Sequence, residues 1–177
     1  MATRWEIVIL GGGFAGLSCA QRLERLLPRE VAERILLVNN ENYFTFYALL
    51  PDVVGASIEP GHVIHPVRQL LKRIQVQRAE VKAIDLTARR VGFEPRDGLA
   101  QVAVEAEHLI LAMGTGADMH AVPGMMEHAL FLRTIADALE LRGHLVRRLE
   151  EANLHPDQVE RQKLLQFLVV GGGFSGV

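Results

Sequence analysis

Short aliphatic runs alternate with amphipathic stretches along the N-terminal part of the chain, a pattern typical of strands separated by helices. The run Trp5–Leu10 predicts a short buried strand, and the residues after it predict a helix that reaches about Leu27. One face of that helix carries small and aliphatic residues at helical spacing, namely Gly16, Ala20, Leu23 and Leu27. Pro28 is expected to end it, since proline cannot donate a backbone hydrogen bond. Ile35–Val38 predicts a second buried strand, which completes a strand–helix–strand unit.

The middle of the chain alternates apolar and polar residues, as strands with one solvent-exposed face do. After an expected strand over Ile74–Arg78, three such segments predict an antiparallel β-meander: Glu80–Asp85, Arg90–Phe93 and Leu99–Val104. Leu109–Ala112 is aliphatic throughout and predicts one more buried strand. The pattern indicates an α/β fold with a parallel sheet, covering helices and an antiparallel β-meander.

Helix signals dominate the remaining segments. Val63–Arg73 predicts a short helix. Thr134 and Asp137 form a capping-box pattern that predicts the start of a longer helix, which Pro156 interrupts. One face of this longer helix is expected to carry Ile135, Leu139, Val146 and Leu149. Leu164–Val170 predicts a last strand.

The same glycine-rich phrase occurs twice, each time after an aliphatic run. The first copy is Gly11–Gly16 (GGGFAG) and the second is Gly171–Gly176 (GGGFSG). Both fit G-x-G-x-x-G, which joins a strand to a helix whose N-terminus binds the pyrophosphate of a dinucleotide. In the first copy, Gly11 permits a tight turn, Gly13 lets the backbone approach the pyrophosphate, and Gly16 permits close packing of the helix on the sheet. Two copies predict an enzyme that holds two different dinucleotides.

The motif also predicts an acidic residue at the end of the second strand, where a carboxylate binds ribose hydroxyls. Here Val38 is followed by Asn39 and Asn40, and Glu41 comes one residue later. An asparagine amide donates and accepts hydrogen bonds but carries no charge. Asn39 is favoured for the ribose contact because Val38 fixes the end of the strand, and Glu41 reaching back is the alternative.

Composition and charge narrow the class of protein. The 177 residues are enough for one well-cored domain, and 49% hydrophobic with 23% charged residues is ordinary globular composition. A net charge of −2 gives no general attraction to nucleic acid, so no nucleic-acid partner is expected. No apolar run reaches the roughly 18 residues that span a bilayer, and no signal peptide is expected before the first strand. The single cysteine, Cys19, cannot form an internal disulfide, and a cytoplasmic location is expected.

Five stretches, in this order, resemble type II NADH dehydrogenases, which belong to the flavoprotein group that includes the pyridine nucleotide-disulfide oxidoreductases. These stretches are Gly11–Gly16, Asn42–Pro51 (NYFTFYALLP), His65–Arg68 (HPVR), Leu109–Thr115 (LILAMGT) and Gly171–Val177. The resemblance extends over nearly the whole chain, and Asn42–Pro51 is similar above all to quinone-reducing members. It implies a Rossmann-like FAD/NAD(P)-binding fold. It also implies an enzyme that transfers hydride from NADH to FAD and passes electrons on to a quinone.

The resemblance further implies where the cofactors bind. The first cradle (Gly11–Gly16) takes the ADP half of FAD, and the second (Gly171–Gly176) takes NAD(P)H. Residues 112–114 match the second flavin motif, in which Met113 stands where threonine is usual. Val81 falls where the backbone contacts the adenine, and Asn39 takes the acidic ribose slot. The full set of expected cofactor contacts is Gly11, Gly13, Phe14, Ala15, Gly16, Asn39, Asn40, Glu41, Val81, Ala112, Met113, Gly114, Gly171, Gly173 and Gly176. Neither a catalytic acid or base nor a metal site is expected.

The resemblance assigns residues 1–160 to the N-terminal portion of an FAD-binding domain and residues 161–177 to the start of a truncated NAD(P)H-binding domain. Because Val177 directly follows the last glycine, we expect the chain to belong to a longer enzyme and not to oxidise NADH by itself at an enzymatic rate. The missing portion is expected to contact the membrane surface, on its cytoplasmic face. The apolar run Leu164–Val170 is expected to favour self-association.

Several alternatives stay open at this point. The chain fits another two-dinucleotide flavoprotein of the sulfide-quinone or ferredoxin-NAD reductase type, or a nucleotide-binding module without redox activity. The aromatic residues Tyr43, Phe44, Phe46 and Tyr47 either pack beneath a loop or line the approach of the flavin or quinone. Cys19 on an apolar helix face is expected to pack rather than to react, and His62 and His65 are expected at the surface rather than on a metal.

Overall fold

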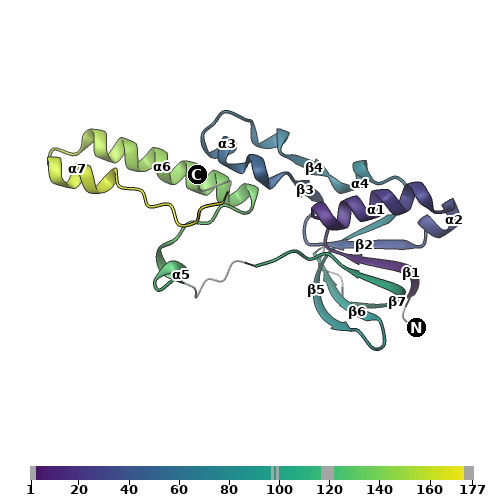
Figure 1. Ribbon diagram of the computed structural model, residues 1–177. Helices are drawn as coiled ribbons and strands as arrows, with labels where there is room; N and C mark the ends of the chain where they lie inside the picture. The colour runs from purple at the N-terminus through teal and green to yellow at the C-terminus, as the bar shows by residue number, and fades with distance from the viewer. Residues whose placement is uncertain (1–2, 97, 99, 117–121, 174–177) are drawn as a thin grey trace. The chain divides into compact units, whose positions relative to one another are not determined.

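The computed structural model describes residues 3–96, 98, 100–116 and 122–173. These residues form two compact units, whose elements are labelled along the chain in Figure 1. Unit 1 lies within residues 1–44 and 65–117, and unit 2 lies within residues 45–64 and 118–177. The chain leaves and re-enters unit 1 through a two-stranded sheet of β3 (Tyr43–Thr45) and β4 (Ile64–Pro66).

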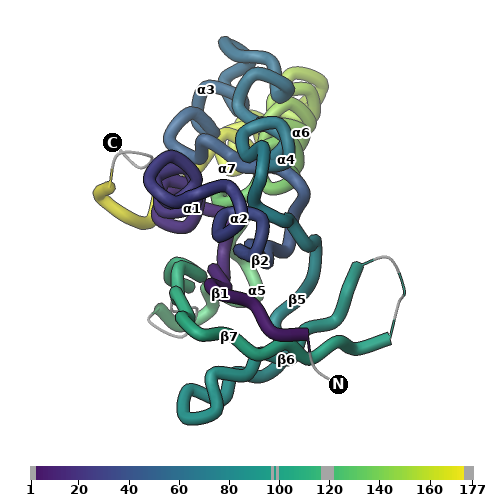
Figure 2. The backbone as a smooth tube through the Cα atoms, turned by 90° about the vertical axis from the view of Figure 1, so that its right-hand side faces the viewer, coloured from purple at the N-terminus to yellow at the C-terminus, as the bar shows by residue number. Residues whose placement is uncertain are grey.

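Unit 1 is built on a closed barrel in the strand order β1-β2-β5-β6-β7. Its strands are β1 (Thr3–Leu10), β2 (Ile35–Asn39), β5 (Gln75–Asp85), β6 (Arg90–Pro95) and β7 (Val102–Leu111). Strand β1 is parallel to β2 and β7, and β2 is parallel to β5, whereas β6 is antiparallel to both of its neighbours. Figure 2 shows β6 and β7 on the side of the barrel away from helix α1 (Phe14–Leu26). The predicted Rossmann-like α/β fold is confirmed.

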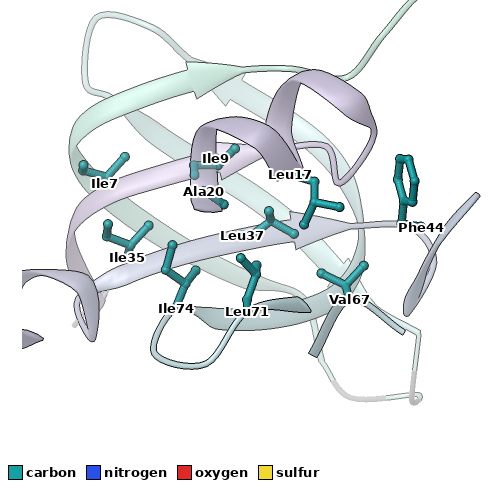
Figure 3. Close-up of a cluster of buried hydrophobic side chains, with 10 residues drawn as sticks. All are labelled: Ile7, Ile9, Leu17, Ala20, Ile35, Leu37, Phe44, Val67, Leu71 and Ile74. Atoms are coloured by element: carbon teal, nitrogen blue, oxygen red, sulfur yellow. The ribbon is translucent and has the colours of Figure 1, made fainter. Parts of the chain in front are cut away.

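Both faces of β1 and β2 are buried. The face that meets α1 forms one core, shown in Figure 3, with Ile7, Ile9, Leu17, Ala20, Ile35, Leu37, Phe44, Val67, Leu71 and Ile74. The face inside the barrel forms a second core with Val8, Leu10, Leu36, Val38, Ala79, Val91, Phe93, Val104 and Ala106. Because successive strand residues point to opposite faces, burial on both sides requires an unbroken aliphatic run. This requirement explains the two runs that the sequence shows.

Helices complete both units. Unit 1 also contains α2 (Arg29–Ala32) and α4 (Val67–Leu70). Unit 2 contains η1 (Tyr47–Leu49), α3 (Leu50–Val54), η2 (Pro60–His62), α5 (Met125–His128), α6 (Ile135–Leu154) and α7 (Gln158–Leu164). Its core joins α3 to α6 through Leu50, Val53, Val63 and Ala138. The predicted capping box of Thr134 and Asp137 is confirmed at the start of α6, which ends before Pro156.

The predicted boundaries within the barrel are wrong in two places. Residues 75–85 form one strand, β5, whose register shifts between Val81 and Ala83, rather than two separate strands. Likewise β7 joins the predicted segments Leu99–Val104 and Leu109–Ala112 into one strand, which begins at Val102. Closing a barrel requires long, bent strands that pair on both sides, and a local alternation pattern does not report this length.

The helix predicted over Val63–Arg73 is also wrong, since only Val67–Leu70 is helical. Pro66 restricts the residue before it to extended backbone, and that residue, His65, lies in β4. At the other end, the backbone N–H groups of Lys72 and Arg73 donate to the carboxylate of Glu24 on α1 rather than to helix carbonyls. Neighbouring elements therefore override the local helix signal.

One prediction in unit 2 is wrong as well. No strand forms at Leu164–Val170: Leu164 ends α7, and no described strand pairs with residues 165–170. A strand needs a neighbour for its backbone hydrogen bonds, which an aliphatic run alone does not provide. Ile135, Leu139, Val146 and Leu149 share one face of α6 as predicted, but Leu139, Val146 and Leu149 are 46%, 50% and 54% exposed. The helix instead buries the small side chains of Ala138 and Ala152.

Candidate dinucleotide-binding site

The candidate site lies at the carboxyl ends of β1, β2 and β7. The backbone N–H of Gly11 donates to the carbonyl of Val38 at 2.8 Å, which ties the glycine turn to β2. The backbone N–H of Ala112 donates to the carbonyl of Leu10 at 2.8 Å, which brings the second predicted flavin motif to the same edge. Two motifs that lie about 100 residues apart in the sequence therefore meet, and ligands of parallel α/β sheets bind at such an edge.

At two positions of the first cradle, another part of the backbone comes so close that only glycine fits. Gly11 has φ of 103°, and a Cβ on it would lie 2.2 Å from the carbonyl oxygen of Ala112. A Cβ on Gly16 would lie 1.8 Å from the carbonyl oxygen of Gly11. Both separations are far below any van der Waals contact, so larger residues cannot occupy these positions without moving the backbone. The predicted roles of Gly11 in the turn and Gly16 in close packing agree with this geometry.

Gly13 stands in the opposite environment. A Cβ placed on it would meet no described atom within 4 Å, and it precedes the first residue of α1. In the part of the chain that the structure describes, no side chain caps α1, and its first turn contains no acidic residue. The first N–H groups of a helix carry a partial positive charge and need acceptors from outside the helix. Open space at the N-terminus of a 13-residue helix therefore fits a bound pyrophosphate.

Asn39 holds the glycine turn directly. Its Oδ1 accepts a hydrogen bond from the backbone N–H of Gly12 at 2.7 Å, and its Nδ2 donates to the carbonyl of Glu41 at 2.9 Å. Gly12 is itself buried, and a Cβ on it would lie 2.8 Å from the Cγ of Asn39. Sequence reasoning missed Gly12, because the motif treats the position between its first two glycines as free. The run of three glycines was the available signal.

The residues after Asn39 form a polar cluster with two arginines. Arg78 donates to the carbonyl of Asn40 at 3.3 Å and lies 3.4 Å from the carboxylate of Glu41. Arg96 contacts the Asn40 side chain at 3.5 Å. Burial first, and then the nearby Glu41 carboxylate, raise the pKa of Tyr43 above its usual value of 10.0. Asn39, Asn40 and Glu41 thus come together at the end of β2, where the adenosine end of a dinucleotide is expected.

Other residues predicted to contact the first cofactor lie in the barrel or at its edge. Val81 lies in β5 opposite Phe93, directly before the register shift. Met113 follows β7 with 56% of its surface exposed, and Gly114 has φ of 75°. Phe14 and Ala15 are exposed in the first turn of α1. Contact of these residues with a cofactor stays a prediction.

Of the four aromatic residues Tyr43, Phe44, Phe46 and Tyr47, Phe44 packs against the first residue of α1, Phe14. The rings of Phe14 and Phe44 meet edge to face with centroids 4.9 Å apart, and Phe44 is buried in the core beneath α1 (Figure 3). For Phe44 the packing alternative therefore holds. Phe46 and Tyr47 are 39% and 58% exposed in unit 2, and contact of these two with flavin or quinone stays a prediction.

The second glycine phrase has different surroundings. Gly171 has φ of 124°, and Gly171, Gly172 and Gly173 would each carry a Cβ without meeting a described atom within 4 Å. Gly176 lies outside the described residues. The structure thus places Gly171 and Gly173 but brings no described strand or helix against them.

The other singled-out residues add no chemistry to the site. His62 and His65 are exposed, and the described part of the chain contains no group of three or more histidine, cysteine, aspartate or glutamate side chains suited to a metal ion. Cys19 is half-buried on α1 as a free thiol. None of the described helices combines the length and apolar character that crossing a membrane requires.

A glycine turn locked between parallel strands, with an uncapped helix N-terminus beside it, places the chain in the class of dinucleotide-binding α/β proteins. Residues 5–177 match the family of pyridine nucleotide-disulphide oxidoreductases, and the chain belongs to this family.

Known proteins agree with this assignment. The chain is 31% identical over 180 residues to the mitochondrial external alternative NAD(P)H-ubiquinone oxidoreductase B4 of Arabidopsis thaliana, covering 97% of this chain and 30% of that protein. It is 34% identical over 177 residues to the type II NADH:quinone oxidoreductase Ndh of Mycobacterium tuberculosis, covering 98% of this chain and 37% of that protein. The resemblance to type II NADH dehydrogenases is confirmed.

Solved structures agree on the fold. NDH2 from Plasmodium falciparum, solved in complex with NADH, matches with a TM-score of 0.76 at 21% identity, over 92% of this chain and 32% of that chain. The chain thus spans about a third of the length of the relatives it matches.

Proposed function

We propose that the first cradle binds the ADP half of FAD, and that the chain is the flavin-binding portion of an oxidoreductase that passes electrons from NAD(P)H to a quinone. The observation that carries the proposal is the open space at Gly13, at the N-terminus of α1 and beside a glycine turn that Ala112 locks. Family membership and the names of the relatives support the electron donor and acceptor.

In this proposal the residues of the chain bind and orient the cofactor. The first turn of α1 supplies backbone N–H groups and a positive dipole end to the pyrophosphate. The end of β2 faces the adenosine, and residues 112–114 let the backbone pass close to the cofactor. Bound FAD supplies the redox chemistry, which amino-acid side chains lack. No side chain of this chain is assigned a proton transfer.

The Gly13→Ala variant tests the proposal. The φ of −77° at Gly13 suits alanine, and the new Cβ meets no described atom within 4 Å. The loss of a good N-cap residue and the lower entropy of the unfolded chain oppose each other, so the free energy of unfolding should change by no more than about 1 kcal/mol. The same methyl group would occupy the space assigned to the pyrophosphate, so FAD and ADP binding should weaken at least roughly tenfold. Flavin absorbance of the purified full chain and ADP calorimetry measure the effect.

Gly173→Ala is the matched control, because its Cβ also meets no described atom within 4 Å. This variant should retain wild-type FAD content. Equal FAD binding by wild type and Gly13→Ala would contradict the assignment of the pyrophosphate to this helix. A colourless wild-type protein that stays colourless after FAD is added would instead favour a module without redox activity.

We assign the second cradle to NAD(P)H, with residues 1–160 as FAD-binding portion and residues 161–177 as the start of the NAD(P)H-binding domain. This assignment rests on the second glycine phrase and on the family match through residue 177. NADH protection of residues 165–173 from hydrogen exchange in the full chain would support it, and protection of residues 11–16 alone would contradict it.

We also propose a peripheral position on the cytoplasmic face of a membrane, where a quinone is available. Sedimentation with lipid vesicles of an oxidoreductase that contains this chain tests the proposal, because the membrane contact is assigned to a portion outside these residues. An oxidoreductase that stays in the supernatant contradicts it. Self-association is proposed through residues 168–170, since Leu168, Val169 and Val170 are 89%, 66% and 57% exposed. Light scattering measures it, and a strictly monomeric chain would contradict it.

A further inference from the structure

We propose that Asn39 is a positioning residue of the first cradle: its amide holds Gly12 and Glu41 at the same time, and nucleotide binding depends on both its acceptor and its donor. The residue in the ribose slot would then act on the glycine turn rather than on the ribose. The proposal rests on the proposed binding of a dinucleotide by this cradle and identifies how the site is kept in shape.

The Asn39 amide accepts one hydrogen bond and donates the other. Oδ1 accepts from the Gly12 N–H at 2.7 Å, and Nδ2 donates to the Glu41 carbonyl at 2.9 Å. A carboxylate offers acceptors only, so aspartate or glutamate at this position would turn an oxygen toward the Glu41 carbonyl. The amide is thus chemically suited to this position, and its presence in place of the usual acid has a physical reason.

Gly12 transmits the effect to the nucleotide. It lies between Gly11, which Ala112 locks, and Gly13, which borders the open space at the start of α1. Because Gly12 is buried, losing the Asn39 acceptor would leave an unsatisfied N–H, which favours a movement of the turn. Such a movement displaces the backbone at Gly13.

The loop after Asn39 has a second support. Arg78 donates to the carbonyl of Asn40 at 3.3 Å and faces the carboxylate of Glu41 at 3.4 Å. This support does not involve Gly12, so removing the Asn39 amide should disturb the glycine turn more than the loop. The two effects can therefore be separated residue by residue.

The test uses the flavin-free full chain and compares wild type with Asn39→Asp, which is nearly isosteric and loses only the donor, and Asn39→Leu, which loses both functions. ADP and 2′-deoxy-ADP are titrated by calorimetry. Asn39→Leu should bind ADP about tenfold more weakly, and Asn39→Asp roughly threefold more weakly, because its carboxylate still accepts from Gly12 and only the contact with the Glu41 carbonyl is lost. The affinity ratio of ADP to 2′-deoxy-ADP should stay the same in all three proteins, because Asn39 does not read the hydroxyl.

Two further measurements exclude a general loss of structure. The deficit of Asn39→Asp relative to wild type should shrink as the pH falls from about 7 to about 4, because a carboxyl protonated near its usual pKa of about 3.9 regains a donor. Amide hydrogen exchange without nucleotide should accelerate at Gly12 in Asn39→Leu but not in Asn39→Asp, whose carboxylate still accepts. A structural defect alone would not produce this division.

Three results would overturn the proposal: wild-type or tighter ADP binding by Asn39→Asp, a 2′-hydroxyl effect that disappears in the variants, or unchanged exchange at Gly12 in Asn39→Leu. If wild type binds neither ADP nor FAD, the proposed function fails. The exchange measurement then decides by itself whether Asn39 holds the turn.

Discussion

The two glycine phrases are nearly identical in sequence and differ in everything that surrounds them. In the first, an added Cβ at Gly11 or Gly16 would run into backbone atoms at 2.2 Å or 1.8 Å. In the second, Gly171 to Gly173 have open space in the described structure. The motif alone therefore does not define a cradle; the strands that converge on it do.

The same contrast extends to the side chains that hold each unit. In unit 1, Asn39 and Glu24 bind backbone groups that lie 27 to 50 residues away in the sequence. In unit 2, Thr134 and Asp157 bind backbone groups two or three residues away, at the starts of α6 and α7. Substitutions in unit 1 should thus affect distant segments, and those in unit 2 should affect single helices.

The largest effect is expected for Gly16→Ala. Alanine gains roughly 1 kcal/mol of helix propensity over glycine, but the contact of 1.8 Å with the Gly11 carbonyl outweighs it. We expect a net loss of roughly 3 kcal/mol or more and loss of FAD binding. Denaturant unfolding of this variant beside Gly173→Ala, which should change by less than about 0.5 kcal/mol, measures the contrast. Equal stability of the two variants would remove the distinction between the glycine phrases.

Glu24→Ala is expected to have the next largest effect. The Glu24 carboxylate accepts from three consecutive backbone N–H groups, at 2.8 Å from Lys72 and 3.2 Å from Ile74, with Arg73 between them. Losing these bonds should cost about 2 kcal/mol and speed amide exchange at residues 72–74. Glu24→Gln keeps an acceptor and should lose less. Unchanged exchange at residues 72–74 in the alanine variant would show that the loop is held by packing alone.

Thr134→Ala should cost about 1 kcal/mol, the usual value of an N-cap. Its Oγ1 accepts from the Asp137 N–H at 3.1 Å, while the Asp137 carboxylate accepts from the Thr134 N–H at 2.8 Å. Hydrogen exchange should increase in α6 and leave the barrel strands unchanged, and Thr134→Ser should restore protection. Faster exchange in β1 would show that the capping contact is not local.

The smallest effect concerns the pH dependence of α7. Hydrogen bonds from the backbone N–H of Glu160 and then of Val159 lower the pKa of Asp157 below its usual value of 3.8. A lowered folded-state pKa means that this cap stabilises α7 fully above about pH 3.8 and ceases to do so as the pH falls through the folded value. NMR titration of Asp157 and of the Val159 amide should show this. Asp157→Asn should remove the dependence, and a wild-type pKa at or above 3.8 would contradict it.

The sequence predicted the parts of the fold that rest on burial and on turn chemistry. The aliphatic runs of β1 and β2, the helix before Pro28 and the Thr134 capping box are all confirmed. It could not predict the length of β5 and β7, because barrel closure depends on strands far apart in the sequence. The absent helix beyond Leu70 has the same origin, since Glu24 on α1 takes the N–H groups that a helix would use.

The roles of site residues were predictable from the sequence where the backbone geometry admits only one residue type. The glycines at positions 11 and 16 are such cases, and the structure requires both. Asn39 was expected to contact a ribose, and its contacts with Gly12 and Glu41 were not predictable, because an amide can bind in either sense and only the folded loop selects its partners.

Strand β7 has a consequence for how the protein is made. Strand β1 pairs with β7, and Thr3 at the start of β1 lies opposite Val104. Strand β6 lies between β5 and β7 and pairs with both. During synthesis β1 therefore emerges from the ribosome long before one of its two neighbours exists. An aliphatic strand in that position is a target for chaperones and for mispairing until residue 111 has emerged, and the barrel should form in one late, slow step.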